Sequence, residues 1–289
     1  MKENQPGIRA QRIHGRLAVA AMTDRGNVRA SNEDAFLVDK NLGLVVVADG
    51  MSGRGEGNMG GAEASALAIK SIYAYLSADT TEAMQPTASD ETIFTDNDTA
   101  PYPETGRRSR GNLSALDRTK DAIAHANAQI YSVNRACGRA DRKGIGTTLA
   151  GLYWPSPAEG RTIVFHVGDC RVYRLRDAVL HQLTHDHSAS QKWIENGMQG
   201  APPARNLLFR AVGPSASVEA EVSTHVLLPG DVILLCSNGL TTMVSNRDIK
   251  TLLHQVVMGL GVEKGTLQLV DMAKANGGKD NITVVLGML

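Results

Sequence analysis

Acidic or amide residues lie at the ends of five short apolar runs, where a rigid strand would hold them at the edge of a sheet. Asp49 is the clearest case, because it follows the apolar residues 44–48 and is followed by Gly50. Comparable positions are occupied by Glu33 and Asp34, by Asp169, by Asn238 and by Asp280. Converging carboxylates repel one another unless cations neutralise them, and hard divalent cations bind oxygen ligands of this kind. The pattern therefore predicts a metal-dependent active site.

Rigid elements are needed to hold these side chains, and the sequence contains many candidates. Apolar runs rich in Val and Ile predict strands at residues 17–22, 35–39, 44–49, 147–153, 162–167, 171–175, 222–227, 231–236 and 282–286. Apolar spacings of three and four predict helices at residues 60–76, 114–136, 246–257 and 262–275, with Ser114 as an N-cap. This order of strands and helices indicates an α+β fold rather than strict βαβ alternation.

Two segments differ from the rest of the chain. Residues 77–112 are rich in Thr, Asp, Pro and Ser and poor in large apolar side chains, so we expect a mobile surface insertion. Both a solvated loop without function and a regulatory or docking loop fit this composition. Residues 185–214 contain several glycines and prolines between two strands, which predicts a flap beside the active site. We expect one domain, residues 1–289, that carries both segments.

Composition excludes several classes of function. The chain has 289 residues, and its 30 Lys and Arg balance its 30 Asp and Glu, so no basic field exists to hold a nucleic acid or an anionic membrane. The three cysteines are scattered without metal-ligand spacing, which fits a reducing compartment. The apolar run at residues 17–22 is too short for a signal sequence or a membrane span. We expect a cytoplasmic monomer that binds neither nucleic acids nor membranes.

Seven short motifs follow one another in a familiar order. The first spans residues 23–29 and 32–35, and the second spans residues 49–53. The others lie at residues 146–148, 167–171, 183–188, 237–240 and 279–283. Together they closely resemble the motifs of the metal-dependent serine/threonine protein phosphatases of type 2C, in their bacterial form. The resemblance covers residues 16–289 apart from the insertion.

The resemblance implies a four-layer α-β-β-α sandwich of two mainly antiparallel sheets flanked by helices, with a binuclear Mn²⁺ or Mg²⁺ centre at one end. By similarity, Asp49 bridges the two ions. Glu33 and the backbone carbonyl of Gly50 serve one ion, while Asp280 and the residue at position 238 serve the other.

Three further roles follow from the same resemblance. Arg29 is similar to the arginine that binds the substrate phosphate, and Asp34 is similar to the residue that orients the metal-bound water. Asp169, with position 238, resembles the site of a third and weaker ion, although capping of its own turn is a rival role. In two-metal sites the ions lower the pKa of a water and clamp the phosphoryl group, so no Ser, Cys or His nucleophile is required. The implied substrates are phosphoserine and phosphothreonine proteins, which a cognate serine/threonine kinase would supply.

Two positions depart from the family pattern. Asn238 stands where the family carries an aspartate, and its amide offers one neutral oxygen in place of a carboxylate. We expect weaker metal binding and weaker activity from this change. Met51 stands where many eukaryotic members have a histidine, and a methionine is common there in bacterial members. The proton for the leaving group would then come from water or from another side chain.

Other interpretations of the same residues compete with this one. An Asp-Gly pair after a strand is usually a plain turn, so it is the ordered combination of motifs that carries the assignment. Residues 55–60 match the dinucleotide-binding GxGxxG pattern, but they begin several residues after the preceding strand, and Asp49 would repel a pyrophosphate. His181, His185 and His187 without cysteines are weak evidence for zinc. A catalytically impaired pseudophosphatase that binds phosphoproteins is the serious alternative, and Asn238 is its one support.

Overall fold

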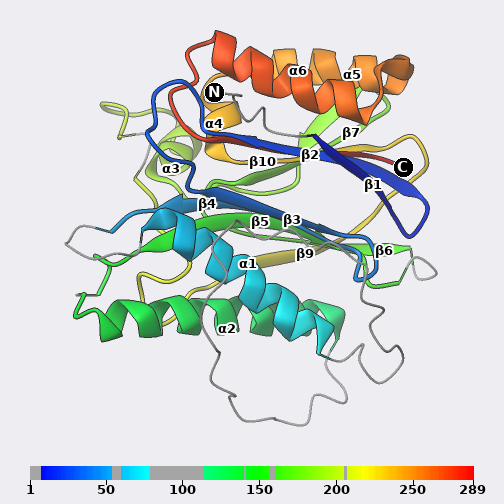
Figure 1. Ribbon diagram of the computed structural model, residues 1–289. Coiled ribbons are helices and arrows are strands. Elements are labelled where there is room, and N and C mark those ends of the chain that lie inside the picture. Colours follow the sequence, from blue (N-terminus) through cyan, green and yellow to red (C-terminus); the bar gives the residue numbers. More distant parts are fainter. Residues whose placement is uncertain (1–7, 54–59, 79–113, 140, 157–159, 205–206) are drawn as a thin grey trace, which may run out of the picture.

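Two antiparallel sheets lie face to face in the centre of the molecule, and helices cover the outer face of each sheet (Figure 1). The computed structural model describes residues 8–53, 60–78, 114–139, 141–156, 160–204 and 207–289. Helices α5 (Asn246–Gln255) and α6 (Val262–Ala275) cover one sheet, and helices α1 (Gly61–Ser77) and α2 (Ala115–Ala136) cover the other. The expected four-layer α-β-β-α sandwich is therefore confirmed.

Within the described residues, the strands form two distinct sheets. The six-stranded sheet beneath α5 and α6 has the order β1 (Arg9–Ile13), β2 (Leu17–Asp24), β11 (Ile282–Met288), β10 (Val232–Cys236), β7 (Arg171–Arg176) and β8 (Val179–Gln182). The five-stranded sheet against α1 and α2 has the order β3 (Asp34–Asp39), β4 (Leu44–Met51), β5 (Gly146–Tyr153), β6 (Arg161–Val167) and β9 (Glu221–Val226).

The central strands are apolar on both faces because each sheet lies between a helical layer and the other sheet. In β4, Val45 and Val47 point into the core between the two sheets. Their neighbours Val46 and Ala48 point the other way, into the core beneath α1 and α2. The continuous apolar run before Asp49 is the sequence signature of this double burial.

Four short elements were not predicted from the sequence: β1, β8, α3 (Ala189–Glu195) and α4 (Asn238–Thr241). β1 and β8 are edge strands with largely exposed residues, and α3 buries none of its residues, so none of the three has a strong apolar pattern. The helix predicted at 246–257 ends as an α-helix at Gln255 and continues as the π-helical turn η3 (Val256–Leu260). The predicted N-cap is confirmed, because the Ser114 side chain accepts a hydrogen bond from the Asp117 backbone N–H.

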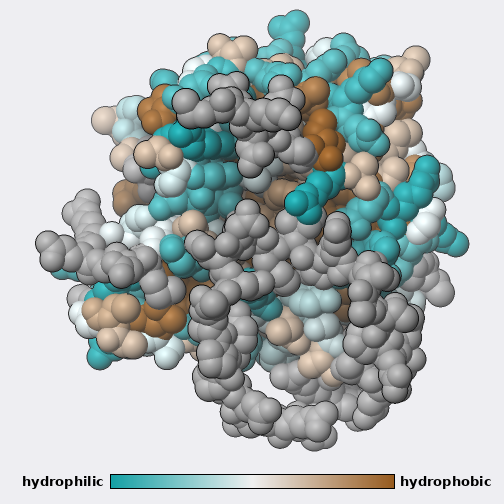
Figure 2. Space-filling model, viewed as in Figure 1, coloured by the Kyte–Doolittle hydropathy of each residue, from teal (hydrophilic) through white to brown (hydrophobic). Residues whose placement is uncertain are grey.

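Much of the coloured surface in Figure 2 is hydrophilic, and brown apolar residues form small separate groups there. None of the helices in the described ranges has the length and apolar composition needed to cross a bilayer. The predicted insertion at 77–112 lies outside the described residues except for Ser77 and Ala78.

The strand register brings the motif-bearing loops to one end of the sandwich. In the five-stranded sheet Asp34 pairs with Asp49, and Asp49 pairs with Thr148 at the start of β5. In the six-stranded sheet Ile282 pairs with Asp24, while Cys236, at the end of β10, pairs with Arg171 at the start of β7. The loops that follow or precede these residues therefore meet at a single edge.

Helix α1 begins in direct contact with this edge. A Cβ atom on Gly50 would lie 2.0 Å from the Gly61 carbonyl oxygen, and a Cβ atom on Gly61 would lie 2.6 Å from the Gly50 carbonyl carbon. The Gly61 N–H also donates a hydrogen bond to Glu33 Oε1 at 3.2 Å. Two glycines therefore allow the helix N-terminus to reach the acidic loop.

We expect Gly61→Ala to force α1 away from Gly50, because the ladder between β4 and β5 keeps Gly50 in place. The cost should be about 1–3 kcal/mol of the free energy of unfolding, measured by urea denaturation. Ala74→Ser, at an exposed position of the same helix, is the matched control and should cost less than about 1 kcal/mol. Equal stability of Gly61→Ala and the wild type would contradict the close packing.

Candidate active site

Acidic side chains are concentrated and buried at the edge where the loops meet. Asp34 is 3% exposed and Asp169 is 8% exposed. Burial raises the pKa of Asp34 to about 7 and the pKa of Asp169 to about 6. Burial also raises the pKa of Asp49 well above its ordinary value, and the negative charges of Asp34, Asp169 and Asp280 add to the effect. These carboxylates therefore lie close enough to destabilise one another's charged forms.

Asp34 joins the two sheets through one carboxylate oxygen. Its Oδ2 accepts hydrogen bonds from Ser237 Oγ and Thr283 Oγ1, both at 2.7 Å. Asp34 begins β3 of one sheet, whereas Ser237 follows β10 and Thr283 lies in β11 of the other. Its second oxygen, Oδ1, is buried and has no partner. A free, buried carboxylate oxygen is suited to a cation or a water that lies in front of it.

Glu33 is fixed by hydrogen bonds to three different segments. Its carboxylate Oε1 accepts hydrogen bonds from Ser52 Oγ at 2.5 Å and from the Gly61 N–H at 3.2 Å. Its backbone N–H donates to Asn281 Oδ1 at 2.8 Å. The amide group of Asn281 also donates to the backbone carbonyls of Arg25 and Ser31, both at 2.9 Å. Asn281 therefore fixes the acidic loop against the start of β11.

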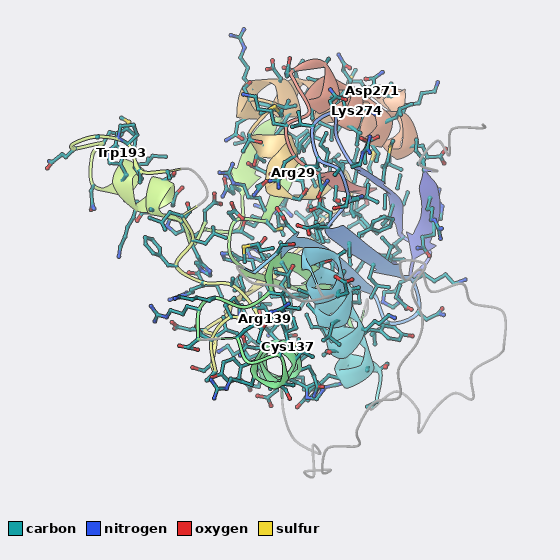
Figure 3. The ribbon with its side chains drawn as sticks, turned by 60° about the vertical axis from the view of Figure 1, so that its left-hand side comes forward. Arg29, Cys137, Arg139, Trp193, Asp271 and Lys274 are labelled. Atoms are coloured by element: carbon teal, nitrogen blue, oxygen red, sulfur yellow. The ribbon has the colours of Figure 1, made fainter. Side chains whose placement is uncertain are left out.

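Arg29 reaches over the acidic residues from the loop after β2. Its Nη2 lies 2.8 Å from Asp280 Oδ2, while the side chain remains 53% exposed. Figure 3 shows Arg29 between the layer that contains α6 and the layer that contains α1. An exposed guanidinium beside a carboxylate cluster is positioned to bind an incoming anion with two parallel N–H donors.

Position 238 lies against Asp169. The Asn238 amide donates a hydrogen bond from Nδ2 to Asp169 Oδ2 at 3.4 Å, and Asp169 Oδ1 is buried without a partner. An aspartate at 238 could not make this bond, because two carboxylates would face each other. The amide N–H therefore offsets part of the negative charge of Asp169, as a cation between two acidic groups would.

The structure brings the predicted residues together at this edge; their assigned roles stay predictions. Asp34 and Asp49 face each other across β3 and β4, Arg29 contacts Asp280, and Asn238 contacts Asp169. Glu33 and Gly50 are joined by a hydrogen bond from the Gly50 N–H to the Glu33 carbonyl at 3.1 Å. The unpaired oxygens of Asp34 and Asp169 and the raised carboxyl pKa values all fit bound divalent cations, which would neutralise the excess negative charge.

Three supporting residues were not assigned a role from the sequence: Ser237, Asn281 and Thr283. Each lies within a recognised motif, but its partner is more than 200 positions away, with separations of 203, 248 and 249 residues. The one signal available in the sequence is a polar residue, Thr283, inside the apolar run at 282–286.

Among the described residues, His181, His185 and His187 do not form a group with metal-ligand spacing. His181 is exposed in β8, His185 forms an ion pair with Glu195, and His187 is buried beside His166. The residues 55–60 lie outside the described ranges except for Gly60.

Because the carboxyl pKa values of Asp34, Asp49 and Asp169 are raised, the folded chain binds protons that the unfolded chain releases. In chelator, stability should be fully present below the ordinary carboxyl pKa near 4 and should fall as pH rises through about 7. Each such group contributes up to about 1.4 kcal/mol per pH unit within this window. Urea denaturation in EDTA across the window measures the slope.

Asp34→Asn is the matched variant, since it keeps the shape and removes one titrating group. Its free energy of unfolding should fall less steeply with pH than that of the wild type, by an amount equal to at most one bound proton. Parallel slopes for the two proteins would rule out a raised pKa at Asp34.

The sequence and the fold both match known proteins. Residues 25–273 match the family described as protein phosphatase 2C. The serine/threonine phosphatase stp of Listeria welshimeri is 31% identical over 272 residues, which cover 91% of this chain and 92% of that protein. The serine/threonine protein phosphatase PstP of Mycobacterium tuberculosis is 31% identical over 275 residues, covering 93% of this chain and 44% of that protein. The crystal structure of the PstP catalytic domain in complex with two manganese ions has a TM-score of 0.71 at 28% identity, covering 94% of this chain and 97% of that one. The chain therefore belongs to the protein phosphatase 2C family.

Proposed function

We propose that this protein hydrolyses phosphoserine and phosphothreonine in other proteins, with Mn²⁺ or Mg²⁺ as cofactor. The observation that carries the proposal is the gathering of carboxylates at one sheet edge, where two buried oxygens, Asp34 Oδ1 and Asp169 Oδ1, have no protein partner. The relatives named above as serine/threonine phosphatases, and the manganese ions bound to one of them, support the same reaction.

Each side chain has a task that its surroundings allow. Glu33, Asp49, Gly50, Asp280 and the residue at 238 would hold two ions, and Asp169 would contribute to a third, weaker one. When bound, such ions supply a low-pKa water and a positive clamp on the phosphoryl group.

Two residues would act directly on substrate and water. Arg29 can exchange its contact with Asp280 for two hydrogen bonds to the substrate phosphate, since its guanidinium is half exposed. Asp34 keeps Oδ2 on Ser237 and Thr283 and presents Oδ1 as an acceptor for the attacking water. The water is thereby oriented without any covalent step on the protein.

The leaving alcohol needs a proton that Met51 cannot give. Met51 ends β4 next to Gly50, at the position where many eukaryotic family members carry a histidine. Solvent water is therefore the proposed proton donor, and the reaction should depend little on any single protein acid for this step.

Asn238 is the reason for proposing a slow enzyme. Its Nδ2 is turned toward Asp169, so its one acceptor oxygen is all that it can offer to a cation. Losing a full negative charge from the ligand set lowers metal affinity. A pseudophosphatase that binds phosphoproteins without turnover is the second candidate, and this same residue favours it. The proposed partners are proteins phosphorylated by a cognate cytoplasmic serine/threonine kinase. The enzyme itself is proposed to act as a monomer.

Asp49→Asn should lower phosphate release from a phosphothreonine peptide by about a hundredfold or more, because the bridging carboxylate is lost. Malachite-green detection at saturating Mn²⁺ measures the rate. Asp177→Asn, an exposed change in the turn between β7 and β8, should leave the rate unchanged. Turnover retained in Asp49→Asn would remove the metal assignment.

Asn238→Asp should raise both Mn²⁺ affinity and peptide dephosphorylation by about tenfold or more, because the missing carboxylate is restored. Calorimetric titration with Mn²⁺ gives the affinity, and the peptide assay with an EDTA blank gives the rate. A wild-type chain slower than Asn238→Asp supports the handicapped phosphatase. If both chains bind Mn²⁺ and neither releases phosphate, the pseudophosphatase replaces it.

A further inference from the structure

A second polar cluster lies at the base of the 185–214 segment, next to the turn that carries Asp169. The rings of His166 and His187 stack with centroids 4.6 Å apart, and His187 Nε2 lies 3.1 Å from Glu221 Oε1. Ligand atoms of His166, His187 and Glu221 lie within 4.8 Å of one another, so distance alone would allow a metal ion.

The hydrogen-bond pattern excludes a metal on His187. The Gly168 backbone N–H donates to His187 Nδ1 at 3.1 Å, so Nδ1 carries a lone pair and the ring proton is on Nε2. That proton is donated to Glu221, and Arg210 Nη1 lies 3.2 Å from the same nitrogen. An ion at Nε2 would require an imidazolate beside a guanidinium. The ring is thus a neutral hydrogen-bond bridge, and burial lowers its pKa accordingly.

His187 forms hydrogen bonds with both the backbone N–H and the backbone carbonyl of Gly168. In addition to the bond to Nδ1, the His187 backbone N–H donates to the Gly168 carbonyl at 2.9 Å. Gly168 has φ +98°, and a Cβ atom there would lie 2.3 Å from Thr148 Cγ2. The turn that presents Asp169 is therefore fixed by a glycine on one side and by His187 on the other.

The same residue also closes the base of the 185–214 segment. The His187 carbonyl accepts a hydrogen bond from the Phe209 N–H at 2.8 Å, and Ser188 forms an antiparallel bridge with Leu208. Beyond this base the segment extends outward to α3, where Trp193 lies far from Arg29 (Figure 3). One histidine therefore connects the base of the segment, β9 and the Asp169 turn.

We propose that His187 is a positioning residue, which fixes the Asp169 turn through the bond from Gly168 N–H to Nδ1 and thereby couples that carboxylate to the base of the 185–214 segment. The proposal rests on the proposed function in one respect: Asp169 must contribute to Mn²⁺ binding for the coupling to affect the metal. A merely structural histidine would affect stability alone. A positioning histidine affects the Asp169 carboxylate in a manner that depends on which ring nitrogen is replaced.

Two variants separate the two ring nitrogens. His187→Asn places an acceptor oxygen where Nδ1 lies but does not reach Glu221. His187→Gln reaches toward Glu221 but leaves the Gly168 N–H without its acceptor. His181→Asn, at an exposed position in β8, is the control. Amide hydrogen exchange and backbone NMR shifts of Gly168 and Asp169 report the geometry, and calorimetric titration with Mn²⁺ reports its consequence.

We expect His187→Gln to lose exchange protection at Gly168, to shift the Asp169 resonances and to weaken the lowest-affinity Mn²⁺ site by about tenfold. His187→Asn should keep the protection and bind Mn²⁺ within about threefold of the wild type. Equal behaviour of the two variants, by exchange or by titration, would overturn the proposal. If no variant binds Mn²⁺, the proposed function fails, and the Gly168 and Asp169 resonances still decide whether His187 sets the turn.

Discussion

The hydrogen bonds that cross between the sheets at Asp34 are the constraint on which the rest of this structure depends. A buried carboxylate from the five-stranded sheet accepts from two hydroxyls of the six-stranded sheet. These bonds offset part of the cost of burying the charge, but they use only one of its oxygens. The other oxygen, together with the neighbouring Asp49 and Asp169, leaves a net demand for positive charge or for protons. This edge therefore carries buried negative charge that the protein's own hydrogen bonds do not neutralise.

The scaffold around the edge limits how far the carboxylates can separate. Asp34 and Asp49 are fixed opposite each other by a β ladder, so their repulsion cannot relax by a rotation of the backbone. Gly50 and Gly61 bring the N-terminus of a helix against the same loop, where its N–H groups favour negative charge. Asn281 ties Glu33 to the opposite sheet. The fold therefore supplies the rigidity, and the unneutralised charge that remains is what a metal-dependent reaction can use.

Much of this could be predicted from the sequence because the acidic residues flank apolar runs. A strand buried on both faces has a recognisable composition, and the residue that ends it must lie at a sheet edge; this fixed the expectation for Asp49 and Asp169. The same reasoning could not find Ser237 or Thr283, since their partner is set by how two sheets pack across more than 200 residues of chain. It also missed β1 and α3, which bury too little apolar surface to leave a periodic pattern. The insertion at 77–112 stays a prediction.

Asn238 changes the balance at this edge in two ways that act in the same direction. An amide in place of a carboxylate removes one charge from the ligand set, which weakens the attraction for a cation. It also donates a hydrogen bond to Asp169, which lowers the cost of leaving that carboxylate without a cation. The chain should therefore tolerate metal loss better than a relative with aspartate at this position, because the repulsion around Asp169 is reduced. The structural demand for cations is weaker at Asp169 than at Asp49. The negative charges of Asp34, Asp169 and Asp280 all raise the pKa of Asp49, and only the charge of Arg29 opposes them. We therefore expect a graded site, in which cations bind more tightly at Asp49 than at Asp169.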